Sequence, residues 1–341
     1  MLQVVNATPL PATLAVFANP AGVECAYAAV KASFDFSSGA PRLAARQAAF
    51  LATDVYWGDP ATSSLRAAAD LTLTKPATDI LLLGRAIAAG GPLGVMDVSL
   101  RVGPVQRTLR VFGDRQWVRH EKGWAISAPR PFERMPLRWE LAFGGCTPAI
   151  EGKDPVHEPR NPVGRGIVGA DEDDFAGRPL PNIEDPADLI TTPADRPCPA
   201  GFAPIPPLWQ PRQSRAGTYD EAWQTRRAPH LPLDFDPFFF NAAPPGLIAP
   251  AYLEGGEAVE ISGCTAGAAL RFALPRLAIE LTWDFDGRRI AVRPVLDTVL
   301  IEPDQGRLQM VWRAELVVDK KLTRLRQVEV RCADLHRAEA A

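Results

Sequence analysis

Residues 277–287 read LAIELTWDFDG, and this stretch decides the class of fold. Every second residue up to Asp286 is apolar, which is the pattern of a strand that buries one face. The stretch ends at Asp286-Gly287, a dipeptide that favours a type I′ turn because both central residues of that turn need φ > 0. A two-residue hairpin loop fixes the register of the two strands. The predicted partners are Trp283 with Ile290 and Leu281 with Val292.

The same two-residue period recurs near both ends of the chain. Residues 308–316 place Leu, Met, Trp, Ala and Leu on one face, directly after a turn signal at residues 304–306. Residues 30–36 alternate in the same way between apolar and polar side chains. Strands with one apolar and one polar face are typical of antiparallel sheets. The sequence therefore predicts a mostly β fold.

Three further local signals predict one turn and two short helices. The glycine of residues 113–114 follows an alternating stretch and suits a type II′ turn into the next strand. Residues 41–51 are rich in alanine, leucine and arginine, which favours a helix. Thr218 with Glu221 forms a capping box, which predicts a short helix that ends before Pro229.

The middle of the chain, residues 144–250, differs in composition from both flanks. It holds 20 of the 34 prolines, each of which fixes φ and removes a backbone donor. Residues 201–245 also carry many aromatic side chains, which are scarce in disordered segments. We therefore expect an ordered, Pro-rich, largely irregular insert. It wraps over an antiparallel β-sandwich or packed sheets formed by residues 1–143 and 251–341, all in one compact unit.

Charge and hydropathy exclude several classes of protein. The net charge is −3, from 37 basic and 40 acidic residues, whereas a nucleic-acid-binding protein needs a basic face. The most apolar stretch, residues 80–96, is interrupted by Arg85 and by glycines, so no membrane helix is predicted. The first residues, MLQVVNATPLPA, have no basic start before the apolar ones. This argues against a signal peptide and predicts a cytoplasmic location.

The cysteines and carboxylates form no catalytic or metal-binding motif. The five cysteines lie far apart without a C-x-x-C pair, so we expect small buried thiols in a reducing cell. The acidic run at residues 171–174 lacks the glycine and the distal glutamate of an EF-hand, which favours a solvated loop over a calcium site. Asp234 and Asp236 point to opposite sides of an extended chain, which does not suit an acid/base pair. We predict no enzyme activity, no metal and no cofactor.

Seven blocks of sequence follow one another along the chain: NATPLPA (6–12), KPATD (75–79), RVFGDRQW (110–117), PFERMPLRWELAFGG (131–145), NPVGRG (161–166), LPNIE (180–184) and AGTYDEAW (216–223). In these blocks and their order the sequence resembles a family of bacterial accessory proteins of the type VI secretion system, which act as effector adaptors or chaperones. The resemblance extends to about residue 316. It also leaves an extended conformation open for residues 41–51.

The resemblance implies a non-enzymatic adaptor. Proteins of that family bind an effector that carries a spike-tip domain of the PAAR or PAAR-like type and help to seat it on the VgrG spike. The expected partners are therefore such an effector and VgrG. Two other classes stay open as alternatives. A carbohydrate-active hydrolase would need two carboxylates roughly 5 to 10 Å apart, and a carbohydrate-binding β-sandwich would use flat aromatic platforms.

Five residues of the insert are candidates for contacts with a partner. Trp209, Tyr219 and Trp223 are amphipathic aromatics of the kind enriched in binding hot spots. Phe239 lies in a run of three phenylalanines that cannot all face inward on a strand. Arg165 lies in the NPVGRG block, which lacks the spacing of a phosphate loop, and it reaches either a loop carboxylate or a partner. The alternative for the aromatics is that they pack the insert onto the sheets.

Overall fold

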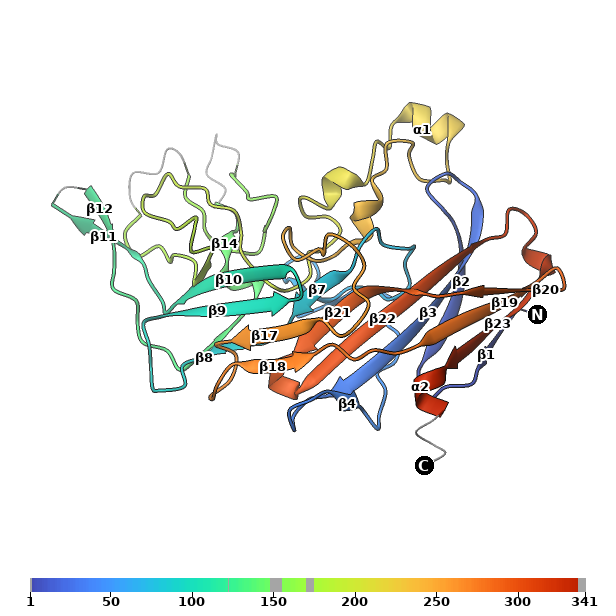
Figure 1. Ribbon diagram of the computed structural model, residues 1–341. Coiled ribbons are helices and arrows are strands. Elements are labelled where there is room, and N and C mark those ends of the chain that lie inside the picture. The colour runs from blue at the N-terminus through green and yellow to red at the C-terminus, as the bar shows by residue number, and fades with distance from the viewer. Residues whose placement is uncertain (1, 122, 148–154, 170–174, 337–341) are drawn as a thin grey trace.

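The computed structural model describes residues 2–121, 123–147, 155–169 and 175–336. Over these residues the protein is mostly β, as predicted, with three larger sheets and four two-stranded ribbons. The sheets follow one another along an elongated molecule, and β1 and α2, near the two ends of the chain, lie at the same end (Figure 1).

The main sheet has the strand order β2-β3-β22-β21-β7, with β4 added beside β3. Its pairs are antiparallel except that β7 runs parallel to β21. Leu308, Met310 and Trp312 face the core, as their alternation predicted. The strands are β2 (Ala12–Ala18), β3 (Glu24–Asp35), β4 (Arg42–Leu43), β7 (Asp79–Leu82), β21 (Val295–Glu302) and β22 (Arg307–Val317).

A four-stranded sheet of order β1-β23-β19-β20 packs on the main sheet through a shared apolar core. The predicted hairpin is confirmed, since Trp283 pairs with Ile290 and Leu281 with Val292. At its turn the φ angles of Asp286 and Gly287 are +54° and +73°, as a type I′ turn requires. The strands are β1 (Gln3–Asn6), β19 (Ile279–Phe285), β20 (Arg288–Val292) and β23 (Leu325–Cys332).

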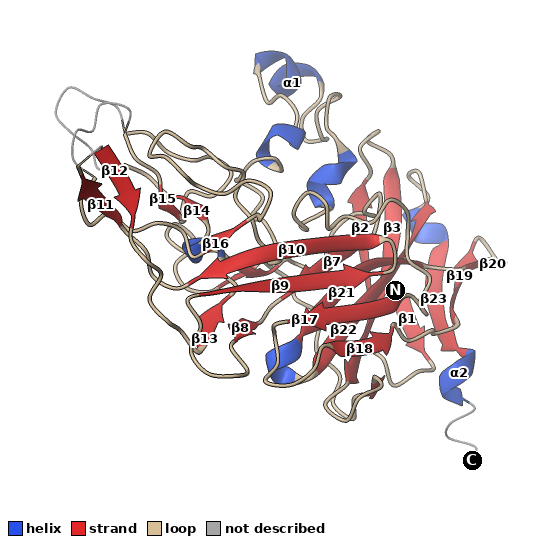
Figure 2. Ribbon diagram, turned by 60° about the vertical axis from the view of Figure 1, so that its left-hand side comes forward, coloured by secondary structure: helices blue, strands red, loops and turns tan. Residues whose placement is uncertain are grey.

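A five-stranded sheet of order β16-β10-β9-β17-β18 draws its strands from all three regions of the chain (Figure 2). Short β16 belongs to the insert, so residues 144–250 take part in this sheet as well as covering others. Its strands are β9 (Val95–Val102), β10 (Val105–Phe112), β16 (Ile183–Glu184), β17 (Ala258–Ser262) and β18 (Leu270–Ala273).

Two-stranded ribbons and short helices complete the described fold. The ribbons are β5 (Val55–Tyr56) with β6 (Leu65–Ala67), β8 (Arg85–Ile87) with β13 (Arg134–Pro136), β11 (Trp117–His120) with β12 (Gly123–Ile126), and β14 (Phe143–Gly144) with β15 (Arg165–Gly166). The helices are α1 (Glu221–Arg226), α2 (Ala333–His336) and the 3-10 turns η1 (Trp139–Leu141), η2 (Gln213–Arg215), η3 (Pro237–Phe240), η4 (Pro303–Gln305) and η5 (Leu322–Arg324).

Two local predictions are wrong, and in both cases a distant contact decides the structure. Residues 41–51 form no helix; after β4 they run along the main sheet, where the Gln47 side chain bonds to the backbone of Ser33. Gly113 makes no type II′ turn. A Cβ at this position would lie 1.6 Å from the carbonyl oxygen of Arg130, so the glycine is there because another segment passes against it.

The start of α1 also differs from the prediction. The N-cap is Asp220, whose carboxylate accepts a hydrogen bond from the amide of Trp223, rather than Thr218. Thr218 instead bonds to Asp234 across the insert. The predicted end is confirmed, because α1 ends at Arg226, before Pro229.

Strand β3 is buried on both faces, whereas the sequence predicted one buried and one polar face. Its second face carries Lys31 and Ser33, which are 4% and 1% exposed. Residues 44–70, which we call the cover, lie over this face of the main sheet and bond to it at both side chains. The main sheet is therefore the middle layer of the molecule at this point.

The NPVGRG block has a structural role in holding the insert. The side-chain amide of Asn161 donates to the carbonyl oxygens of Trp139 and Phe143, at 2.8 and 2.9 Å. A Cβ at Gly144 or Gly164 would come within 2.1 and 2.4 Å of Asn161 atoms, so glycine is required at both positions. This close backbone packing fixes the start of the insert to the segment around η1.

Candidate functional site

Residues 216–240, which we call the arm, project beyond the sheets and carry α1 and η3 (Figures 1 and 2). Three of its apolar side chains are exposed, Tyr219 by 52%, Leu233 by 88% and Phe238 by 38%. Large apolar side chains gathered on an ordered, projecting segment are typical of a surface that contacts another protein. The arm is therefore the candidate binding surface.

The arm is closed on itself by polar contacts. The backbone amide and the hydroxyl of Thr218 both donate to the carboxylate of Asp234, at 3.0 and 2.7 Å, and these bonds hold the pKa of Asp234 below its usual value. The indole Nε1 of Trp223 donates to the carbonyl oxygen of His230 at 2.8 Å. Asp220 caps α1. The exposed side chains are thus displayed on a fixed backbone.

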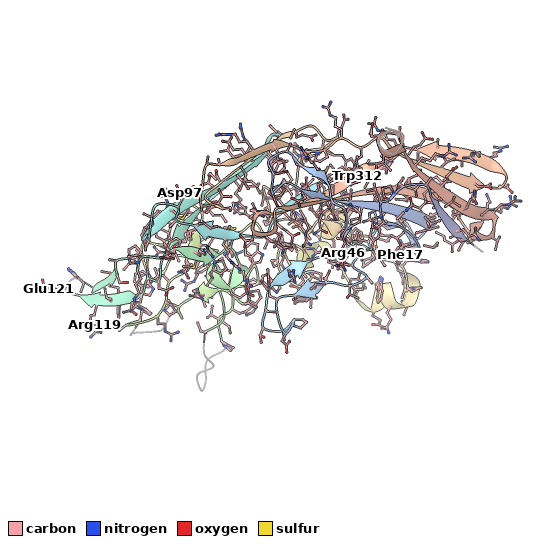
Figure 3. The ribbon with its side chains drawn as sticks, turned by 90° about the horizontal axis from the view of Figure 1, so that it is seen from below. Phe17, Arg46, Asp97, Arg119, Glu121 and Trp312 are labelled. Carbon is pink, nitrogen blue, oxygen red and sulfur yellow. The ribbon has the colours of Figure 1, made fainter. Side chains whose placement is uncertain are left out.

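The base of the arm rests on the turn between β2 and β3. The guanidinium of Arg227 donates to the carbonyl oxygen of Pro20 at 2.6 Å. A Cβ at Gly22 would lie 3.3 Å from the ring of His230, so the two segments are already in close contact. Phe17 of β2, which is 41% exposed, lies on the side of the strands that faces the arm (Figure 3). The apolar surface of the arm therefore continues onto β2.

Tyr219 and Trp223 lie together on the arm. Their rings meet edge to face with centroids 4.7 Å apart and an interplanar angle of 68°. Trp223 is half-buried and anchors the loop through His230, whereas Tyr219 is open to solvent. Of this predicted pair, Tyr219 is the one available for a contact and Trp223 supports it.

Trp209 and Phe239 pack inward. Trp209 is only 7% exposed and its ring meets that of Trp139 edge to face, with centroids 6.5 Å apart. It therefore packs the insert onto the core, which is the alternative that the sequence left open, and it offers no surface to a partner. Phe239 is half-buried, with its ring centroid 5.5 Å from that of Phe235 and 5.7 Å from that of Phe240.

Arg165 serves as an internal clamp. It is half-buried, and its guanidinium donates to the carbonyl oxygen of Glu140 and to the side-chain oxygen of Asn182, both at 3.1 Å. Burial lowers its pKa, and the nearby Asp114 partly offsets that shift. These contacts join β15 to the LPNIE block.

The described residues contain no group of three or more His, Cys, Asp or Glu side chains arranged to hold a metal ion. The acidic run 171–174 lies outside these residues. Asp234 accepts from Thr218, 16 residues away, and so helps to close the arm, whereas Asp236 accepts the amide of Phe238 and stabilises the local turn at the start of η3. No helix in the described part of the chain is long and apolar enough to cross a membrane.

Two cysteines depart from the expectation that all five are buried. Cys146 and Cys198 are exposed, while Cys25, Cys264 and Cys332 are buried free thiols. Burial raises the pKa of Cys25 and of Cys264 to about 12 each, so neither is a reactive thiolate at neutral pH.

Comparison with protein families gives a match over residues 21–313, most of the chain, to a bacterial family described as "Uncharacterized protein conserved in bacteria (DUF2169)". The chain belongs to this family. No curated protein and no solved structure matches it.

Two features of this DUF2169 chain were not predicted from the sequence. Leu233 is the most exposed large apolar residue of the arm, but a single leucine in an irregular segment follows no pattern. Trp57 and Arg66 belong to the β5–β6 ribbon and Arg138 to a distant segment, and the fold brings both guanidinium groups to the ring of Trp57. No pattern in the local sequence predicts that these side chains lie together.

Proposed function

We propose that the protein is a non-enzymatic cytoplasmic adaptor of the type VI secretion system. It binds an effector through a PAAR or PAAR-like spike-tip region and delivers this effector to VgrG. Binding rests on surface complementarity: the arm covers apolar surface that the free effector exposes. An interface above about 1,000 Å² in total is expected for a stable complex of this kind.

The observation that carries the proposal is the arm itself. Leu233 is 88% exposed and Tyr219 52%, and covering the leucine alone with another apolar surface would contribute about 1.5–3 kcal/mol to binding. Hydrogen bonds of Thr218 and Trp223 hold the backbone that carries these side chains, so little backbone freedom is lost on binding. The resemblance of the sequence blocks supplies the identity of the partner.

The alternatives drawn from the sequence receive less support. A hydrolase would need two carboxylates free to act in one cleft, whereas Asp234 and Asp236 on the arm accept hydrogen bonds from the backbone amides of Thr218 and Phe238. A sugar-binding platform would present flat aromatic faces, whereas Tyr219 and Trp223 meet edge to face. Both features favour an apolar contact with another protein.

The test is co-expression with a PAAR-type effector encoded in the same genome, followed by purification and calorimetric titration. We expect Tyr219→Ala or Leu233→Asp to weaken binding by about 2 kcal/mol or more, as for a central residue of an interface. Thermal melting should change little for Leu233→Asp, because that side chain is already 88% exposed.

The matched control is Leu208→Asp, which alters an apolar side chain that is 76% exposed but lies outside the arm. It should bind like the unmodified protein. For Trp223→Ala, the binding affinity must be compared with the melting temperature, because this indole supports the arm. If every arm variant folds and still retains the effector, the adaptor surface lies elsewhere.

A further inference from the structure

Two cavities adjoin between the main sheet and the cover. The first, of about 310 Å³, lies against the second face of the main sheet and is walled by small side chains of the cover, among them Ala48, Ala49 and residues 67–69. The second, of about 430 Å³, is lined by Trp57, Arg138 and residues near η4. Arg66, Leu83 and Glu302 line both, so the two spaces meet at these side chains.

Most charges of the first cavity are already paired. Its lysines and arginines outnumber its carboxylates, but four of the five cations bond to a carboxylate within the protein. Arg66 is the exception. The four pairs are Lys31–Asp70 at 2.7 Å, Lys75–Asp79 at 2.8 Å, Arg307–Glu302 at 2.5 Å and Arg313–Asp297 at 2.6 Å.

Arg66 and Arg138 share one aromatic ring and lack an acceptor. Their guanidinium carbons lie 5.2 and 3.7 Å from the centroid of the Trp57 ring. Within the described part of the chain, neither guanidinium makes a hydrogen bond or an ion pair. The indole Nε1 of Trp57 is buried and also has no partner. Three donor groups without an acceptor therefore line the second cavity, and Arg66 among them also lines the first.

Hydrogen bonds join the two backbone segments that carry the three donor groups. Trp57 and Arg66 come from the β5–β6 ribbon, whose Ser64 donates from its amide and hydroxyl to the carboxylate of Glu140, at 2.7 and 2.9 Å. Arg138 and Glu140 belong to one short segment, and the amide of Leu137 within it bonds to Gly84. The backbone segments that carry Trp57, Arg66 and Arg138 are therefore fixed relative to one another.

Two like charges held near one ring repel each other, and a bound anion removes that cost. Guanidinium groups bind planar or tetrahedral oxyanions through paired, charge-assisted hydrogen bonds. Next to these groups, the first cavity has the size of a small-ligand site; its cover side is walled by alanines, and its other side carries charges that are paired within the protein. We propose that the junction of the two cavities binds a carboxylate or phosphate group between Arg66 and Arg138, with the apolar part of the ligand against the alanine wall of the first cavity.

The oxyanion can belong to a free small molecule or to an acidic side chain of a bound peptide, and defined probes separate these sources. Isothermal titration is carried out on the full chain with octanoate, uncharged octanamide, inorganic phosphate and an acetylated hexaglutamate peptide. We expect octanoate to bind with a Kd of about 1 mM or lower and octanamide much more weakly. Binding of the peptide alone would assign the site to an acidic segment of a partner protein.

Arg66→Gln and Arg138→Gln should each weaken binding about tenfold, and the double variant should abolish it. The matched control is Arg119→Gln. Arg119 also lies over a tryptophan, 5.6 Å from the ring of Trp124, but at the tip of the β11–β12 hairpin, far from the main sheet (Figure 3). This control should bind the probes unchanged.

A third variant tests the site without changing either arginine, so the test does not depend on the folding of the arginine variants. Ala68→Leu fills part of the first cavity and should weaken octanoate while leaving phosphate unaffected. The proposal is overturned if none of the charged probes binds, if octanamide binds as well as octanoate, or if Arg66→Gln and Arg138→Gln leave binding unchanged.

Discussion

At the scale of single residues, the carboxylate of Asp79 joins two distant parts of the chain. It is fully buried and accepts hydrogen bonds from Lys75 at 2.8 Å, from Asn241 at 2.9 Å, and from the amides of Ala242 and Ala243 at 2.9 and 3.2 Å. A buried charge is tolerated only when it is paired and its oxygens are satisfied. Asp79 thus fixes the start of β7 to the end of the insert.

Asp79→Asn should destabilise the fold by about 3–5 kcal/mol, because it leaves the buried ammonium of Lys75 without a countercharge. The free energy of unfolding in urea measures this effect. Asp304→Asn is the matched control: that carboxylate is 28% exposed and lies 3.5 Å from Arg85, so its loss should cost under about 1 kcal/mol. Equal losses in the two variants would contradict the role given to Asp79.

At the scale of elements, local chemistry sets the hairpin of β19 and β20. Asp286-Gly287 selects its own turn, and the alternation of residues 279–285 then determines which side chains are buried. No distant residue is needed for either step. This is why the register from Trp283 to Ile290 could be predicted from the sequence alone.

Gly287→Val should destabilise the protein by about 1–3 kcal/mol, because a β-branched residue is strained at a φ of +73°. A Cβ at this position would meet no other atom within 4 Å, so the cost comes from the backbone alone. Gly90→Val is the control, since Gly90 has equally open surroundings and no positive φ. Thermal melting checks both; an unchanged Gly287→Val would show that the turn tolerates another conformation.

Elements that depend on distant contacts could not be predicted from the sequence. The sequence predicted a turn at Gly113, but the glycine is needed there because the backbone of Arg130 passes close to it. Residues 41–51 read as a helix, but bonds to Ser33 in β3 hold them along the main sheet. Trp209 reads as a surface anchor, but the ring of Trp139 packs against it in the core. Each of these contacts pairs segments whose proximity follows only from the completed fold.

The two candidate binding sites also differ in whether the sequence could predict them. Tyr219 and Trp223 could be singled out because both lie in one short block at the start of a predicted helix. The donor groups of Trp57, Arg66 and Arg138 come from two segments that the bond between Ser64 and Glu140 holds together. Such a site has no signature in any single stretch of sequence.

At the scale of the whole molecule, a buried thiol lies in or directly beside each of the three sheets. Cys25 lies in β3 of the main sheet, Cys332 in β23 of the four-stranded sheet, and Cys264 just after β17 of the five-stranded sheet. One apolar core, to which Cys264 and Cys332 belong, spans all three sheets. The sheets should therefore open together.

Thiol labelling tests this expectation. In the native protein, Cys146 and Cys198 should react at once because they are exposed, and Cys146→Ser with Cys198→Ser should remove the fast phase. Cys25, Cys264 and Cys332 should react slowly, with one shared rate set by global unfolding, because burial raises the pKa of each thiol and excludes the reagent. Mass spectrometry of labelled peptides separates the three positions. Earlier labelling of Cys264 than of the other two would mean that the five-stranded sheet opens as a separate unit, and the single cooperative core would then be wrong.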